Sequence, residues 1–255
     1  MEAIAEELAL HLIHRLQHTP SDARLLVGIS GIPASGKSTL AVLVVNKVNT
    51  LLKQPNPVEH SVGENDAPSG HTVSAGIPSA ILVGLDGWHL TRAQLDAFPD
   101  SKLAHDRRGI HWTFDGDAYV SFVKSLRHPL SSSAPAITAP SFDHALKDPT
   151  PHAITILSEY RIVVIEGLYC FLSIPPWAEA GLLLDERWFI ELDVEEASKR
   201  LVKRHVLTGV AKDMEEAIWR SEQNDMPNGK FIIANMLEPT RVIHSIDDTN
   251  YSVTA

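Results

Sequence analysis

A glycine-rich segment carries the clearest chemistry in the sequence. It reads Gly31-Ile32-Pro33-Ala34-Ser35-Gly36-Lys37-Ser38 and fits the phosphate-binding pattern G-x-x-x-x-G-K-[S/T] in full. The glycines of such a loop let backbone N–H groups close on phosphate oxygens. We expect Lys37 to reach the β- and γ-phosphates and the Ser38 hydroxyl to ligate Mg²⁺. The segment therefore predicts a nucleoside triphosphate site.

The segments on either side have the patterns that such a loop requires. Residues 25–29 form a short apolar run, long enough for a buried parallel strand, and apolar positions from 40 to 51 recur at helical spacing. A helix after the loop points its positive end at the bound anion. The residues that we expect to contact phosphate are Gly31, Pro33, Ala34, Ser35, Gly36, Lys37, Ser38 and Thr39.

Many phosphate-loop (P-loop) proteins hydrolyse nucleotides, and two such classes fit the sequence poorly. A GTPase reads guanine with N-K-x-D after a strand. The nearest match, Asn46-Lys47-Val48-Asn49, lies in the helix after the loop and ends in Asn. Motor and transporter ATPases usually have an apolar strand that ends in Asp or Asp-Glu, whereas the corresponding strand here ends in Glu166-Gly167. These differences favour a kinase.

A small-molecule kinase needs a carboxylate at the acceptor hydroxyl, a metal-holding group and mobile cations over the transferring phosphoryl group. Asp86 follows the apolar run 80–85 and is the candidate base, while Glu166 follows the run 160–165 and is the candidate metal ligand. The helical segment 195–207 carries a basic cluster that suits a lid: Arg200, Lys203, Arg204 and His205. Each has a simpler alternative, since a strand-end carboxylate can be a turn residue and a basic helix face is usually only solvated.

Alternating apolar runs and helical patterns predict an α/β fold with a mostly parallel five-stranded sheet, helices on both faces and a helical lid. The expected strands are 25–29, 80–85, 160–165, 188–192 and 241–246. The expected helices are 5–16, 40–51, 90–98, 117–127, 195–207, 213–224 and 230–237, with Pro227 interrupting the last two. Such folds bind ligands beyond the carboxyl ends of their strands, where Asp86 and Glu166 would lie.

We interpret residues 1–255 as a single P-loop domain. It would begin with a helical region at 1–22 and contain a lid region at 195–228. Residues 53–79 combine repeated Pro and Gly with no apolar period, which predicts a flexible insertion loop at the surface.

The composition excludes several other kinds of protein. The formal net charge is −10, so the chain has no broad positive surface for nucleic acid or anionic membrane. A single cysteine, Cys170, forms no disulfide within the chain. The acidic start is unlike a signal or transit peptide, and no apolar run approaches the length of a membrane span, so we expect a cytoplasmic protein. The sequence leaves its oligomeric state open.

Further motifs in order along the chain resemble the superfamily of uridine kinase, phosphoribulokinase and bacterial-type pantothenate kinase. The resemblance extends from about residue 25 to residue 247 and is strongest to the fructose-transport-system kinase-like group with its fungal relatives. The motifs are Gly36-Lys37-Ser38-Thr39, Asp86-Gly87-Trp88-His89-Leu90, Arg107-Arg108-Gly109, Thr113-Phe114-Asp115, Pro140-Ser141-Phe142-Asp143-His144, Asp148-Pro149, Glu166-Gly167, Arg204-His205-Val206-Leu207-Thr208-Gly209 and Asn224-Asp225-Met226-Pro227-Asn228.

The resemblance implies a small-molecule kinase that uses ATP and Mg²⁺, and it implies roles for particular residues. Asp86 would be the catalytic base, with a place near the metal, Ser38 and Glu166 would serve Mg²⁺, and Arg200 and Arg204 would form the lid. Two asparagines, Asn224 and Asn228, would lie near the adenine or cap the helices that they flank. The acceptor pocket would draw on His89, Arg108, Phe114, Asp115, Phe142, Asp143 and His144.

The acceptor itself stays open between a nucleoside such as uridine, pantothenate and a sugar. Arg107 and Arg108 would fit an anionic acceptor but would equally suit the surface, and Phe114-Asp115 and Phe142-Asp143 would also suit turns and helix caps. Trp88 and the segment 110–112 differ from common bacterial patterns near the acceptor site. The rival functions are a nucleotide-binding regulator or slow ATPase without transfer, and an adaptor that has lost nucleotide binding, which the complete P-loop disfavours.

Overall fold

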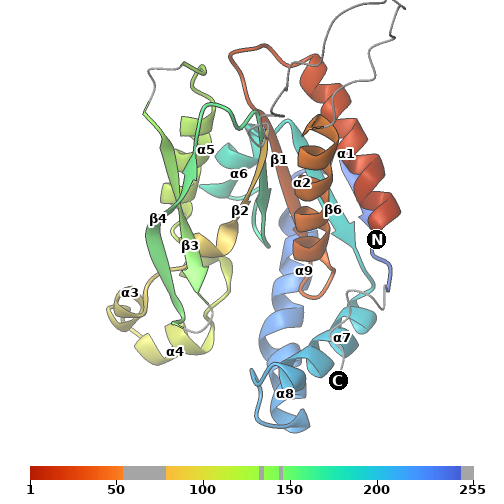
Figure 1. Cartoon of the computed structure of the whole chain (residues 1–255). Helices are drawn as coiled ribbons and strands as arrows, with labels where there is room; N and C mark the ends of the chain where they lie inside the picture. Colours follow the sequence, from red (N-terminus) through yellow and green to blue (C-terminus); the bar gives the residue numbers. More distant parts are fainter. Residues whose placement is uncertain (54–78, 132–134, 144–145, 248–255) are drawn as a thin grey trace, which may run out of the picture.

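Five parallel strands form the central sheet (Figure 1). The computed structural model describes residues 1–53, 79–131, 135–143 and 146–247. The strand order is β2-β5-β1-β6-β7, and every neighbouring pair is parallel. The strands are β1 (Leu25–Gly31), β2 (Ala80–Gly84), β5 (Ile162–Glu166), β6 (Glu186–Glu191) and β7 (Arg241–His244). The predicted α/β fold with a five-stranded sheet is confirmed.

Helices connect and cover these strands. They are α1 (Glu2–Gln17), α2 (Lys37–Lys53), α3 (Arg92–Asp96), α4 (Ser101–Asp106), α5 (Gly116–Leu126), α6 (Trp177–Leu182), α7 (Val194–Leu207), α8 (Met214–Arg220) and α9 (Met226–Asn235). Shorter 3₁₀ turns occur at Leu85–Trp88 and His111–Thr113. Within the described ranges, no helix has both the length and the apolar character needed to cross a membrane. Residues 54–78 of the predicted insertion loop lie outside the described residues.

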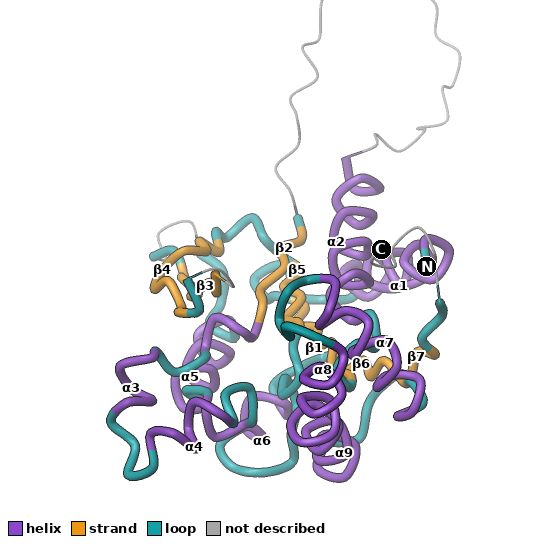
Figure 2. The backbone as a smooth tube through the Cα atoms, turned by 90° about the horizontal axis from the view of Figure 1, so that it is seen from below, coloured by secondary structure: helices purple, strands orange, loops and turns teal. Residues whose placement is uncertain are grey.

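The two faces of the sheet bury separate apolar clusters. Alternate side chains of β1 and β5 point to opposite faces, so Val27 and Val164 join one cluster while Leu26 and Val163 join the other. Helices α1 and α2 cover the first face, and α5, α7 and α9 contribute to the cluster on the second (Figure 2). Burial on both faces explains why these strands read as continuous apolar runs.

A buried carboxylate on β6 ties α1 to the sheet. Glu186 accepts hydrogen bonds from the indole of Trp188 at 3.2 Å and the hydroxyl of Thr240 at 2.7 Å. From α1, it contacts His11 at 3.0 Å and Arg15 at 3.2 Å. Burial acts to raise the pKa of Glu186, but the hydrogen bonds outweigh burial, so the pKa lies below its usual value.

Replacing Glu186 with Gln should lower the free energy of unfolding near neutral pH by about 2 kcal/mol, because α1 loses its ionised partner. The folded-state pKa lies below the unfolded value, so the wild-type advantage is lost as the pH falls through the folded-state pKa. Urea unfolding at a series of pH values measures this difference. Glu6→Gln removes an exposed carboxylate paired with Lys47 and should change little. Equal stability of Glu186→Gln and wild type near neutral pH would contradict the prediction.

The structure corrects two expectations about secondary structure. Pro227 does not interrupt a helix: α8 continues through a π-helical turn, Ser221–Asp225, directly into α9, and Pro227 lies in the first turn of α9. The first turn of a helix tolerates proline because its N–H groups have no helical partner. The sequence patterns also missed an antiparallel hairpin of β3 (Ile137–Asp143) and β4 (Asp148–Ile156), together with the short helices α4 and α6.

Candidate active site

Three adjacent strands bring the predicted chemical groups to one edge of the sheet. In the sheet register, Glu166 at the end of β5 lies between Ile29 of β1 and Gly84 of β2. The P-loop begins at the end of β1, and Asp86 lies two residues beyond β2. The hairpin with α3 and α4 lies to one side of this edge, and α7 and α8 lie to the other (Figure 1).

The P-loop has the backbone that a phosphate cradle needs. Ala34 and Gly36 have positive φ angles of 61° and 86°, which turn the chain tightly before α2 begins at Lys37. A Cβ atom on Gly31 would lie 2.6 Å from the Ser35 hydroxyl and 2.8 Å from the Ile190 carbonyl oxygen, so only glycine fits there. The N–H groups at the start of α2 face this loop end and favour an anion.

Four polar groups interact at the centre of the edge. The Ser38 hydroxyl stabilises the charged form of the Glu166 carboxylate. Burial raises the pKa of Glu166 above 4.5, and the charge of Asp86 raises it further, while Lys37 and the Ser38 hydrogen bond oppose the rise. This arrangement places an ammonium, a hydroxyl and two carboxylates within electrostatic reach of one another.

The oxygen atoms of this cluster fit a partly hydrated Mg²⁺ ion. Among the described residues, no group of three or more His, Cys, Asp or Glu side chains could hold a metal. Mg²⁺ commonly binds through one or two protein oxygens and takes its other ligands from water and substrate phosphates. Ser38, Glu166 and Asp86 supply donors of this chemistry beside the phosphate cradle, so the residues fit the ion that the sequence predicts.

Aromatic rings form one wall beside Asp86. The His89 ring lies between Phe114, at a centroid distance of 3.9 Å, and Phe142, at 4.7 Å. His89 Nδ1 donates to the Asp86 backbone carbonyl at 2.8 Å. The Arg108 guanidinium carbon lies 5.4 Å from the centre of the Phe142 ring. Four of the residues predicted for the acceptor pocket are therefore brought together beside the candidate base.

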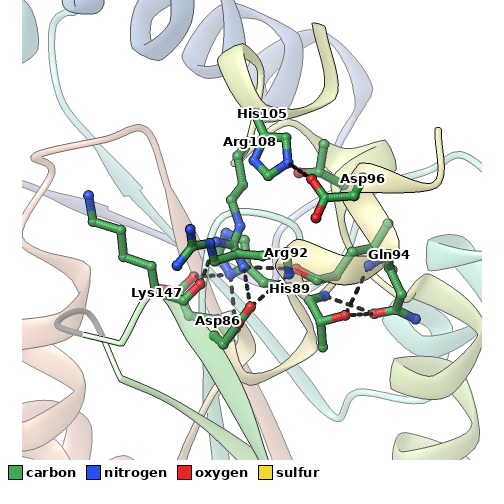
Figure 3. Close-up of polar contacts among 12 residues, drawn as sticks. Asp86, His89, Arg92, Gln94, Asp96, His105, Arg108 and Lys147 are labelled. Carbon is green, nitrogen blue, oxygen red and sulfur yellow. Dashed lines mark hydrogen bonds and ion pairs between the residues drawn. The ribbon is translucent and has the colours of Figure 1, made fainter. Parts of the chain in front are cut away.

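The Arg108 guanidinium is bonded mainly to the protein. It donates to the backbone carbonyls of Leu90, at 2.8 Å, and Lys147, and it contacts the Asp148 carboxylate at 3.4 Å. Figure 3 shows Arg108 near Lys147, His89 and Asp86. These bonds join the loop after His89 to the hairpin tip, so Arg108 is a structural support of the wall rather than a free cation.

The two predicted acceptor aspartates lie at turns. The Asp115 carboxylate accepts from the Ala118 N–H at 2.9 Å and caps α5, and the Asp115 N–H donates to the Trp88 carbonyl at 2.8 Å. The Asp143 carboxylate accepts from the Leu146 N–H at 3.2 Å. Both carboxylates are exposed, and cap chemistry accounts for these contacts. His144 lies outside the described residues.

The hairpin packs against the Asp86 turn at Gly87. A Cβ atom there would lie 2.3 Å from the Pro140 carbonyl oxygen and 2.7 Å from its carbon. Gly87→Ala should therefore lower the free energy of unfolding by about 2 kcal/mol and weaken acceptor phosphorylation, because the Phe142 wall must move. Urea unfolding and turnover measure both effects. Gly84→Ala, with nothing within 4 Å of its Cβ, is the matched control and should change little. Wild-type behaviour of Gly87→Ala would show that the contact tolerates a methyl group.

The basic cluster on α7 divides into three environments. Arg200 donates to Glu196 at 3.1 Å and to the Ser245 hydroxyl at 3.1 Å. His205 is buried and bonded to Asp225 at 2.9 Å. Lys203 lines an apolar groove between α7 and α8.

Arg204 and the two predicted asparagines lie around the π-helical turn. Although Arg204 as a whole is exposed, protein atoms crowd its guanidinium and lower its pKa, and the Asp225 carboxylate opposes this change. Asn224 belongs to the π-helical turn. Asn228 is buried in α9. A Cβ atom on the next residue, Gly229, would lie 3.2 Å from the side chain of Ile32 in the P-loop. Helix α9 thus packs against the P-loop at the residue that follows Asn228.

Sequence patterns missed Tyr169 and Asp225 as parts of this region. The Tyr169 hydroxyl donates to the Gly109 carbonyl at 2.8 Å, and burial, together with the charges of Asp86 and Asp225, raises its pKa. The only signal for Tyr169 is its place three residues after Glu166, and Asp225 was recognised only within the N-D-x-x-N motif.

Comparison with known proteins identifies the class. No protein-family model matches the chain. It is 45% identical over 153 residues to the ATP-dependent kinase-like protein notR' of Aspergillus versicolor, covering 60% of this chain and 89% of that protein. It is 31% identical over 241 residues to a Schizosaccharomyces pombe protein described as a "putative uridine kinase", covering 94% and 90%.

Solved structures agree with these relatives. YFH7 of Saccharomyces cerevisiae, described as "a putative P-loop containing kinase", superposes with a TM-score of 0.77 at 25% identity, covering 96% of this chain and 99% of that one. A Silicibacter protein described as a "putative fructose transport system kinase" superposes with a TM-score of 0.73 at 24% identity, covering 94% of this chain and 98% of that one, which supports the fold.

The fold, the P-loop and the relatives together define an ATP-dependent P-loop kinase. The chain belongs to the superfamily of uridine kinase, phosphoribulokinase and bacterial-type pantothenate kinase, together with its fungal relatives. The resemblance inferred from the sequence motifs is confirmed.

Proposed function

We propose that this kinase transfers the γ-phosphoryl group of Mg·ATP to a hydroxyl group of a small metabolite. The observation that carries the proposal is the convergence of Lys37, Ser38, Glu166 and Asp86 at one sheet edge, next to the aromatic wall around His89. A hydrolase needs no such wall beside its carboxylate, whereas a transferase must hold an acceptor there.

Each residue has a defined task in the proposed reaction. The P-loop N–H groups and Lys37 bind the triphosphate and neutralise its charge. Mg²⁺, held by the Ser38 hydroxyl and by Glu166 directly or through water, would neutralise further phosphate charge. Asp86 accepts the proton of the acceptor hydroxyl while the oxygen of that hydroxyl bonds to the γ-phosphorus. At the same time, the bond between the γ-phosphorus and the oxygen that bridges it to the β-phosphorus breaks, which releases ADP.

The lid residues would complete the site. Arg200 and Arg204 on α7 supply cations that can close over the transferring group and exclude water. Arg200 is bonded to Glu196 and Ser245 in this structure, so lid closure would exchange these partners for phosphate oxygens. Asn224 and Asn228 would lie towards the adenine.

The acceptor class follows from the wall rather than from free charge. Because Arg108 is bonded to protein carbonyls and to Asp148, it shapes the site and leaves little positive charge for an anionic acceptor. The acceptor would contact His89, Phe114 and Phe142 of the wall, together with Asp115, Asp143 and His144. An uncharged alcohol such as a nucleoside or sugar suits this wall better than pantothenate.

A coupled ADP-release assay tests the function. The protein is incubated with Mg·ATP and nucleosides, sugars or pantothenate, and then with a small-molecule extract and ¹⁸O-labelled ATP, so that mass spectrometry detects any new phosphate ester. The expected result is acceptor-dependent ADP release with a labelled ester. Steady ATP hydrolysis with no ester from either source would contradict transfer and favour the slow ATPase or regulator.

A further inference from the structure

A short segment joins the acceptor side of the site to the lid side. Residues 107–111 follow α4 and carry the Arg107-Arg108-Gly109 motif. Arg107 donates to the backbone carbonyl of Gln223 in the π-helical turn. The ring of His111 stacks on that of Phe231 in α9, with centroids 4.6 Å apart and planes at 4°. The segment thus has two contacts with the α8–α9 region.

The same segment is bonded to the acceptor wall. Arg108 donates to the carbonyls of Leu90 and Lys147 beside His89. Gly109, at a φ of 108°, turns the chain and accepts from the Tyr169 hydroxyl at 2.8 Å. Consecutive arginines therefore point to opposite sides of the site, Arg107 to the π-helical turn and Arg108 to the wall.

The π-helical turn is in turn bonded to the lid helix. Asp225 is bonded to His205 of α7 at 2.9 Å, and Ser221 shares a hydrogen bond of 2.9 Å with Ser198 of α7. Helix α7 also carries Arg200 and Arg204. Continuous polar contacts therefore lead from the lid helix through the turn to Arg107. π-Helical turns are uncommon and frequently occur at functional sites.

We propose that Arg107 and His111 are positioning residues that couple the lid to the acceptor wall. When nucleotide draws α7 towards the phosphates, the π-helical turn would move with it, and Arg107 and His111 would carry the movement to the segment that holds Arg108. The acceptor wall is then ordered by ATP before transfer. This inference rests on the proposed function, because it assigns a task to the closing lid.

Burial supports the role of His111. Its ring lies against Phe231, and burial lowers the pKa of His111, so the ring stacks as the neutral form near neutral pH. No described charged group is bonded to the His111 ring. The contact between His111 and Phe231 is therefore apolar, and close packing of the two rings can transmit a movement of the lid to the segment 107–111.

Hydrogen exchange with a non-hydrolysable nucleotide tests the coupling without the acceptor. Mg·AMP-PNP should slow amide exchange in wild type at 31–40, at 194–225 and at 107–115, the last by about fivefold. In Arg107→Ala, the slowing at 31–40 should persist, and the slowing at 107–115 should fall below about twofold. Arg107→Lys, which keeps the charge, should give an intermediate result.

A matched control and stability measurement separate coupling from misfolding. Lys102→Ala removes a cation from α4, the helix that precedes Arg107, and it should behave as wild type. The Lys102 side chain is 86% exposed, and its only ion pair among the described residues is with Asp106. The unfolding midpoint of Arg107→Ala should stay close to that of wild type. Full slowing at 107–115 in Arg107→Ala, or none in wild type, would overturn the inference. No slowing at 31–40 in wild type would instead contradict nucleotide binding and the proposed function.

Discussion

Asp86→Asn is expected to lower acceptor phosphorylation by about 10³-fold while Mg·ATP affinity stays within about threefold. Asparagine has nearly the same shape as aspartate but does not accept the hydroxyl proton. The Asp86 carboxylate lies two residues beyond the end of β2, beside the His89 wall and within electrostatic reach of Glu166. Because Lys37 and the P-loop backbone remain, the nucleotide should still bind.

Turnover with a confirmed acceptor and calorimetric titration with Mg·AMP-PNP measure the two quantities separately. Asp96→Asn is the matched control, because the Asp96 side chain in α3 is 68% exposed and is bonded to His105 at 2.8 Å. Its turnover should equal that of wild type. Undiminished transfer by Asp86→Asn would remove Asp86 from the role of base and would require another group to take the proton.

Glu166→Gln should separate stability from activity. Burial raises the pKa of Glu166, so the ionised carboxylate opposes folding near neutral pH. Its neutral isostere should therefore raise the free energy of unfolding by about 1 kcal/mol in the absence of nucleotide. Turnover should fall by about 10²-fold, since the amide is a poorer ligand for Mg²⁺ than the carboxylate.

The pH dependence gives the sign of this effect. The folded protein binds a proton at Glu166 at pH values where the unfolded chain does not. The contribution of Glu166 to stability therefore becomes less favourable as the pH rises from the pKa of Glu166 in the unfolded chain to its pKa in the folded protein. The advantage of Glu166→Gln should therefore be absent at acid pH and full above the folded-state pKa. Urea unfolding across pH measures it.

A carboxylate at the end of another strand of the same sheet is the control for Glu166. Glu191 at the end of β6 is exposed and bonded to His244 at 2.9 Å, so Glu191→Gln should alter neither stability nor Mg²⁺ dependence appreciably. A loss of stability in Glu166→Gln would show that attraction to Lys37 outweighs burial. Unchanged turnover would show that Glu166 does not serve the metal.

The local pattern of the sequence was sufficient for the central sheet and the phosphate cradle. The runs at 25–29, 80–85 and 160–165 became β1, β2 and β5, because strands buried on both faces are apolar at nearly every position. The P-loop is equally local, since its chemistry resides in eight consecutive residues. The parallel arrangement then requires that residues following these strands meet at one edge, which is why Asp86 and Glu166 could be paired from sequence.

Partners distant in sequence decided the rest. The hairpin was missed because its strands contain Pro140, Pro149 and Pro151. Proline argues against a strand unless the strand lies at the edge of a sheet or contains a bulge. Its register shifts between Ala139 and Ser141, around Pro140, and that proline packs on Gly87. The hairpin thus depends on a contact more than 50 residues away, which no local pattern contains.

The tertiary structure also assigned different tasks to residues of the same type. Arg107 and Arg108 are adjacent and chemically identical, yet one reaches Gln223 in the π-helical turn and the other the Leu90 and Lys147 carbonyls. Residue type and spacing determined that this chain has a nucleotide site with carboxylates beside it. Which cations are free for a ligand was decided by the fold, because a guanidinium bonds to whichever acceptors the folded chain brings within reach.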